Sequence, residues 1–168
     1  MRFEGAARLV HSETVGVPVD LEDELDRLYG LDLADFVAER TRLTRALRKE
    51  GRRAEAAQVQ ELRRPSLSVW TINQLARRRR KDLDLLLDAG HRLAMTQRAL
   101  LTGGDQKPFE EARKDEQAAL KRLVQAARSI LAERASPATV ERVTSTLRAA
   151  AVSDDARPDL AGASHHRR

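Results

Sequence analysis

Residues 108–134, PFEEARKDEQAALKRLVQAARSILAER, decide the fold class of this chain. Their apolar side chains recur at spacings of three, four and eight residues, as in a helix that packs lengthwise on another helix: Phe109, Ala112, Leu120, Leu123, Ala127 and Ile130. Pro108 suits the first turn of a helix, because its missing N–H would have no partner there. We therefore expect one long helix that ends before Ser136 and Pro137.

The composition of the whole chain supports an all-helical protein. Of its 168 residues, 41% are apolar and 34% are charged, as expected for helices with one apolar side and an ionised outer face. Only 3% of the residues are aromatic, and the common Ala, Leu, Arg and Glu form helices more readily than strands. The length suits one domain, and the absence of Cys suits a reducing compartment.

Caps and helix-breaking residues predict the remaining elements. Six further helices are expected, at residues 21–29, 33–50, 52–63, 67–80, 83–101 and 137–151. The expected N-caps are Asp20, Asp32, Ser66 and Ser136. The sequence leaves open whether 67–80 and 83–101 form one continuous helix. The predicted fold is a bundle of about seven helices in a single domain, 20–151. It is preceded by an irregular arm, 1–19, and followed by a disordered tail, 152–168.

Charge is distributed unevenly along the chain. Residues 1–35 contain 3 Lys or Arg against 9 Asp or Glu, whereas residues 36–81 contain 14 against 4. Such an arrangement favours either an anionic ligand or an internal clamp, in which the acidic start folds back on the basic segment. The expected clamp residues are Glu22, Asp23, Glu24 and Asp26.

Two of the predicted helices carry basic stripes. In the first, at 33–50, Leu33, Phe36, Val37, Leu43 and Leu47 share one face, and Arg42, Arg45, Arg48, Lys49 and Arg52 gather opposite. In the second, at 67–80, Trp70, Gln74, Arg77 and Lys81 share one side, with Asn73 beside them. The run from Arg77 to Lys81 places Arg79 toward the apolar side, at the edge of the core, where it must snorkel or pair.

The Trp70 stripe has two interpretations. As a binding face, it offers an aromatic ring for base stacking, amides for an adenine edge and cations for phosphates. As a packing face, it would bury Trp70 against a neighbouring helix. The predicted nucleic-acid site combines both stripes: Arg42, Arg45, Arg48, Arg52, Trp70, Asn73, Gln74, Arg77, Arg78, Arg80 and Lys81.

The segment Pro65 to Arg77, of the form PSxxxWxxNQLAR, resembles a group of uncharacterised, Ala/Arg-rich helical proteins of high-GC actinobacteria. The likeness covers roughly residues 25–150 and includes Leu28 to Leu31 and Phe36. It implies a helical fold and a bacterial cytoplasmic setting, and no established activity.

Motifs for catalysis are missing from the sequence. It contains no HExxH, GxxxxGK[ST], GxGxxG or GxSxG pattern. A helix-turn-helix match over residues 52–80 is weak, because the usual Gly of the turn is absent although Ala57 suits the small inward position. We therefore expect a cytoplasmic, non-enzymatic protein without cofactor or metal and without a membrane partner. Its expected partner is DNA or RNA; the alternative is a scaffold protein that binds a partner helix or a second copy.

Overall fold

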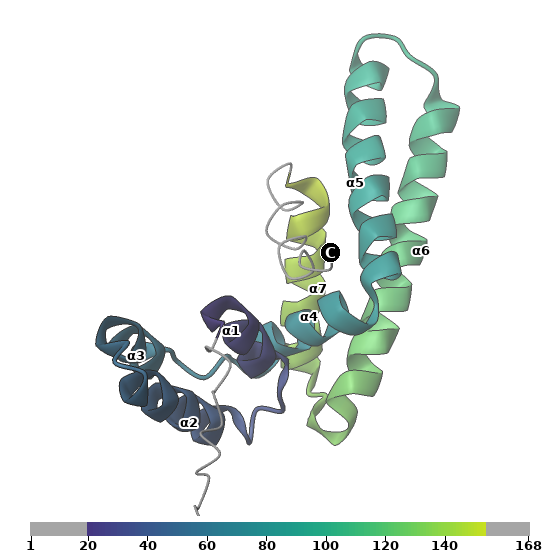
Figure 1. The fold of residues 1–168 in the computed structure, drawn as a ribbon. Coiled ribbons are helices and arrows are strands. Elements are labelled where there is room, and N and C mark those ends of the chain that lie inside the picture. Colours follow the sequence, from purple (N-terminus) through teal and green to yellow (C-terminus); the bar gives the residue numbers. More distant parts are fainter. Residues whose placement is uncertain (1–19, 154–168) are drawn as a thin grey trace, which may run out of the picture.

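The computed structural model describes residues 20–153 and confirms the all-α fold class (Figure 1). Within this range the elements are α1 (Leu21–Gly30), α2 (Phe36–Lys49), α3 (Arg53–Glu61), α4 (Leu67–Arg78), α5 (Arg80–Leu101), α6 (Gln106–Leu131), a short 3-10 helix η1 (Ala132–Arg134) and α7 (Pro137–Val152). The predicted arm and all but the first two residues of the predicted tail lie outside the described residues. Helix α7 extends one residue beyond the predicted domain end at 151.

Side-chain caps begin three of the helices where the sequence predicts them. The Asp20 carboxylate accepts the backbone N–H of Glu22 at 3.0 Å, which starts α1. The hydroxyls of Ser66 and Ser136 cap α4 and α7 in the same way. Asp32 does not cap α2, because that helix begins four residues later, at Phe36.

The helices bury two separate groups of apolar side chains. The larger core lies between α4, α5, α6 and α7 and contains Leu75, Leu86, Leu123 and Leu147. The smaller core joins α2 to α3 through Leu43, Leu47, Ala56 and Val59, with Leu21 and Leu25 of α1 packed against it. Figure 1 shows α1 to α3 grouped at one end of the molecule, whereas α5 and α6 form a long hairpin at the other.

Helices α4 and α5 are separate, which resolves the question that the sequence left open. The break falls at Arg79, whose backbone leaves helical geometry at φ −129° and ψ 34°. Its side chain is half exposed and its Nε lies 3.5 Å from Asp82. The prediction that Arg79 must snorkel or pair is confirmed by its ion pair with Asp82, whereas the half-exposed side chain does not lean into the core.

Helix α7 packs closely on the first half of α5. A Cβ atom on Gly90 would lie 2.1 Å from the backbone oxygen of Ala151, so this contact requires glycine. Beyond Gly90, α5 continues to Leu101 as one arm of the hairpin. Val37, predicted on the buried face of its helix, is 45% exposed, because it lies at the edge of that face.

Candidate nucleic-acid interface

Trp70 is buried and cannot stack on a base. Its side chain is 4% exposed, and its indole N–H donates a hydrogen bond to the Leu31 carbonyl oxygen at 2.7 Å. The guanidinium of Arg134 lies over the ring, 4.8 Å from its centroid. Of the two interpretations of Trp70, the packing face is confirmed and the stacking face is wrong, because the ring fills the junction between α4 and the end of α1.

Gln74, one turn further along α4, is also buried. Its side chain is 2% exposed, and Nε2 donates to the Gly30 carbonyl oxygen at 2.9 Å. Asn73 beside it is half-buried. The prediction that Gln74 binds an adenine edge is therefore wrong, since its amide satisfies a backbone carbonyl at the end of α1.

Arg77 completes this row on α4 and binds Asp26 of α1. Its two terminal nitrogens lie 2.8 Å and 2.6 Å from the Asp26 carboxylate oxygens, and one of them also donates to the Asp26 backbone oxygen at 2.6 Å. A Cβ on Gly30 would come within 3.2 Å of the guanidinium carbon of Arg77. Arg77 thus holds α1 in place, whereas the sequence predicts it as a phosphate ligand.

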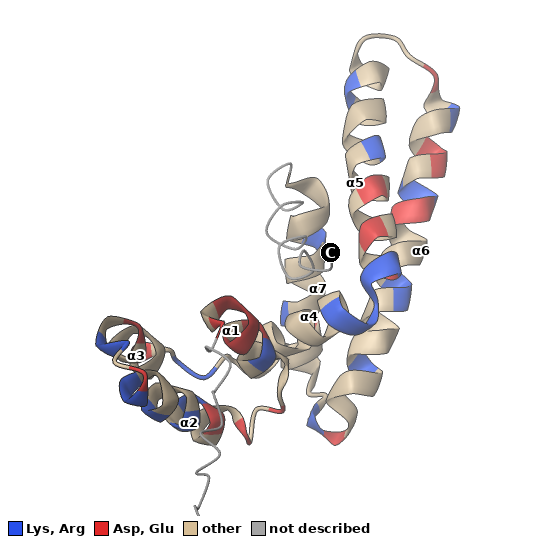
Figure 2. Cartoon of the chain, in the orientation of Figure 1, with Lys and Arg blue, Asp and Glu red and all other residues tan. Residues whose placement is uncertain are grey.

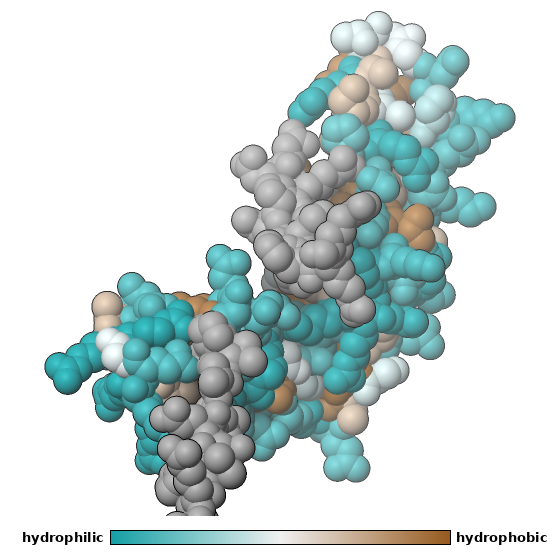
Figure 3. Space-filling view, in the orientation of Figure 1, coloured by the Kyte–Doolittle hydropathy of each residue, from teal (hydrophilic) through white to brown (hydrophobic). Residues whose placement is uncertain are grey.

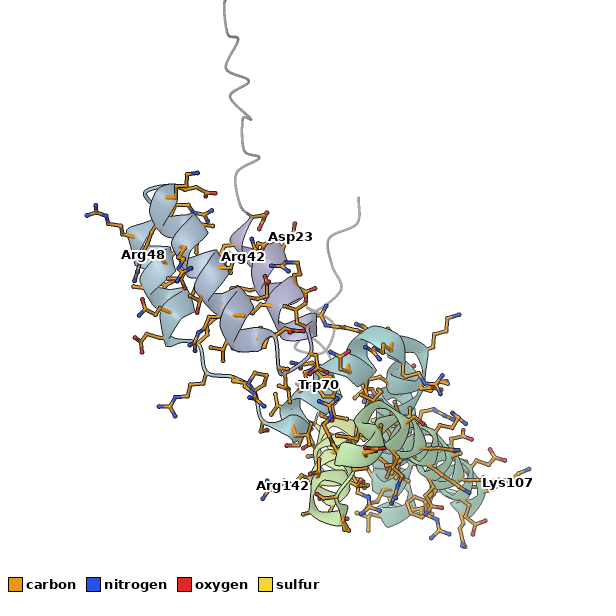
Figure 4. The ribbon with its side chains drawn as sticks, turned by 90° about the horizontal axis from the view of Figure 1, so that it is seen from below. Asp23, Arg42, Arg48, Trp70, Lys107 and Arg142 are labelled. Atoms are coloured by element: carbon orange, nitrogen blue, oxygen red, sulfur yellow. The ribbon has the colours of Figure 1, made fainter. Side chains whose placement is uncertain are left out.

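These contacts form one structure that we call the α1 seam, made of Trp70, Gln74 and Arg77 on α4 and Asp26, Gly30 and Leu31 at the end of α1. Each of the three α4 side chains donates to a backbone carbonyl oxygen at or near the C-terminal end of α1. Carbonyl groups at the end of a helix lack hydrogen-bond partners within the helix. Figure 4 places Trp70 where the α1 to α3 group meets the remaining helices. The seam joins the two parts of the fold.

Asp32 ties the loop after α1 to the turn between α6 and α7. Its carboxylate accepts the Ala34 backbone N–H at 3.1 Å and lies 3.4 Å from the Arg134 guanidinium. The Ala34 hydrogen bond is the main cause that lowers the pKa of Asp32, and Arg134 adds to it. Arg134 therefore contacts both the loop and Trp70.

Acidic side chains neutralise several other predicted site residues. Arg42 lies 2.7 Å from Glu39 and 3.2 Å from Glu24. Arg42, followed by Arg27, lowers the pKa of Glu39 through hydrogen bonds to its carboxylate. The predicted clamp is thus confirmed for Glu24 and, through the seam, for Asp26; Glu22 and Asp23 are exposed.

Three more predicted site cations have polar partners. Arg52 pairs with Glu55 and Glu50, and its hydrogen bond lowers the pKa of Glu55. Arg80 pairs with Asp84 at 3.0 Å. Arg48 donates to the Gln60 side chain on α3 and still extends into solvent.

The exposed cations that remain fall into separate places (Figure 2). Within the described part of the chain, Arg45 and Lys49 on α2 and Arg78 and Lys81 at the α4–α5 junction have no ion pair. The structure therefore does not gather the eleven predicted residues into one site. Lys49 was left out of that predicted site, although its position one turn after Arg45 was a usable signal.

Three further exposed cations lie outside the predicted site. Arg53, Arg63 and Arg64 are exposed and were also missed. Ala57 is exposed, so it does not take the small inward position that the weak helix-turn-helix match assigned to it.

The described residues 20–153 contain no group of three or more His, Cys, Asp or Glu side chains placed to hold a metal. Within the same range, no helix is both long and apolar enough to span a bilayer. No family model matches the sequence, and no curated protein and no solved structure is similar enough to count as a match.

Proposed function

We propose that this protein binds the phosphate backbone of nucleic acids without catalysing a reaction, through the outer side of α2. We call this surface the α2 cationic face and define it as Arg42, Arg45, Arg48 and Lys49. The observation that carries the proposal is the state of Arg45 and Lys49, which are exposed and lack an ion pair among the described residues. An unpaired cation gains more from a phosphate than one that must first leave a carboxylate.

The dimensions of this face suit a short length of backbone. From Arg42 to Lys49 the row spans about 10 Å along α2, at 1.5 Å per residue. Phosphates follow each other every 3.4 Å or so along the axis of one DNA strand, so the row faces about three of them. Arg42 is already bound to Glu24 and Glu39. The remaining three cations predict a salt slope near −3 on a log–log plot for duplex DNA.

Burial of the α1 seam makes the proposed binding independent of base identity. Neither Trp70 nor Gln74 is exposed enough to contact a base. Contacts from the α2 cations to phosphates position the protein on the backbone and carry no sequence information. We therefore expect similar affinity for different DNA sequences of equal length.

Fluorescence anisotropy with labelled duplex DNA, single-stranded DNA and RNA at several salt concentrations tests the proposal. The variant Arg45→Gln/Lys49→Gln should bind more weakly and lower the magnitude of the salt slope by about 2, one per lost phosphate contact. The matched control, Arg142→Gln/Arg148→Gln, removes the same charge from exposed positions on α7. Figure 4 shows Arg142 far from Arg48.

Trp70 provides a second readout in the same titrations, because it is the only Trp in the chain. Bound nucleic acid should leave its fluorescence unchanged if the α1 seam stays closed. Absence of binding near physiological salt, or an equal loss of binding in both double variants, would contradict the proposal.

A helical interaction protein is the second candidate function. The half-exposed side chain of Leu85 on α5 favours it, since this leucine borders a groove on the helical hairpin.

A further inference from the structure

A groove of about 200 Å³ runs between α5 and α6. Its lining combines an exposed leucine with small and charged side chains: Leu85, Arg92, Asp115, Ala118, Ala119 and Arg122. Leu85 is 52% exposed and lines the groove beside Ala118 and Ala119. Figure 3 shows an apolar patch among hydrophilic side chains on this hairpin. Helix α7 contacts α5 on another side, through Gly90, and leaves Leu85 uncovered.

Ion pairs between the two helices mark both ends of the groove. At one end Arg92 of α5 lies 2.9 Å from Asp115 of α6. At the other end Asp82 of α5 lies 3.4 Å from Arg122 of α6. Along each helix, therefore, one end of the groove carries an acid and the other end carries a base.

This charge pattern is complementary to itself. A twofold axis across the hairpin would reverse each helix against its copy, and would pair Asp82 with Arg92 of the other molecule on α5. The same axis would pair Asp115 with Arg122 of the other molecule on α6. On α5 the midpoint of its pair is residue 87, and on α6 the midpoint falls between Ala118 and Ala119.

The two midpoints lie at about the same level of the hairpin, because each falls halfway between the ion pairs Arg92–Asp115 and Asp82–Arg122. These pairs are separated by about 15 Å along α5 and about 10.5 Å along α6, so shared equally the offset is about 2 Å at each pair. One twofold axis therefore places an acid opposite a base on both α5 and α6. In a twofold interface every contact occurs twice, so this agreement is what a self-complementary surface requires.

We infer that the groove between α5 and α6 binds a second copy of this chain, in an antiparallel arrangement of the two hairpins. Leu85 of one molecule would enter the space beside Ala118 and Ala119 of the other, where small side chains let two helices approach closely. The four helices would form an antiparallel bundle around these residues. This inference concerns α5 and α6 and does not depend on phosphate binding by α2.

Sedimentation velocity of the full chain, from low to high micromolar concentration, tests the inference. Concentration-dependent dimers are expected. The variant Leu85→Glu should raise the dimer dissociation constant at least about tenfold, because it places a charge at the centre of the interface. Met95→Glu is the matched control on the same helix, since Met95 is 51% exposed and lies outside the groove. It should change the constant by less than about twofold.

The arrangement itself can be tested by a disulfide, because the natural chain contains no Cys. In the variant Ala118→Cys, the new cysteine would lie next to the twofold axis. Its thiol should form a disulfide with the second copy under mild oxidation and so give a covalent dimer. The variant Ala149→Cys, at an exposed position on α7, should not form a covalent dimer. Circular dichroism checks that all variants keep their helix content.

Three outcomes would overturn the inference. A monomer at every concentration would mean that the groove is empty or is filled by the same chain or by a different protein. Dimers that resist Leu85→Glu would place the interface elsewhere. Covalent dimers of Ala149→Cys at the rate of Ala118→Cys would contradict the antiparallel arrangement.

Discussion

Replacing Arg77 with lysine separates its observed role in the α1 seam from a role in binding phosphate. Lysine keeps the positive charge, so a phosphate contact would largely survive the change. It cannot reproduce the planar fork that contacts both Asp26 carboxylate oxygens and the Asp26 backbone oxygen. We therefore expect Arg77→Lys to lower stability and leave nucleic-acid affinity unchanged.

The size of the loss follows from the contacts of Arg77. A lysine Nζ can retain one of the three hydrogen bonds, so two are lost. The two side chains are 27% and 48% exposed, which places each bond at the weak end of the usual range, near 0.5 kcal/mol. The expected decrease in the free energy of unfolding is about 1 kcal/mol. It should shrink in 1 M salt, which screens partly exposed charges.

Urea denaturation followed by Trp70 fluorescence and circular dichroism measures this loss. With a urea m-value of about 2 kcal/mol/M, the midpoint should fall by about 0.5 M. Arg78→Lys is the matched control, because Arg78 is the next residue, is exposed and has no ion pair among the described residues. Equal stability of the two variants would refute the role of Arg77 in the seam.

Two further predictions concern packing and pH. Gly90→Ala should destabilise the protein by about 1–3 kcal/mol in urea denaturation, because the new Cβ would meet the Ala151 backbone; helix propensity alone predicts stabilisation, so a gain would contradict the close approach. The pKa of Glu39 is lowered when folded, so its ion pairs stabilise the protein above the unfolded pKa and are lost as pH falls below about 5. The urea midpoint of the wild type should therefore exceed that of Glu39→Gln at pH 6 and match it near pH 3, and an equal difference at both pH values would contradict this linkage.

Local sequence signals predicted most of the helices because the causes are themselves local. Ser66 and Ser136 cap the helices that follow them, and Gly51 and Gly103 have positive φ, at 79° and 92°, where helices end. The break at Arg79 was not predictable, since no Gly or Pro marks it. It arises where α4 and α5 must turn to share one core.

The candidate site was predicted only in part, because the sequence identifies cations but not their partners. A helical wheel placed Arg42 and Arg45 on the outer side of their helix, and both are exposed. It could not show that Arg42 binds Glu24, which lies 18 residues away, while Arg45 has no such partner. Which cations stay available depends on how α1 packs on α2.

The sequence by itself determined that this protein is helical, where most helices begin and end, and that its charge is uneven. Only the tertiary structure decided that the Trp70 face is buried against the end of α1 and is not an open binding face. Leu31 lies 39 residues from Trp70 and Asp26 lies 51 residues from Arg77. A helical wheel describes one helix alone, so it cannot reveal that the end of α1 covers this face. Burial depends on contacts between distant segments, and these form only when the chain folds.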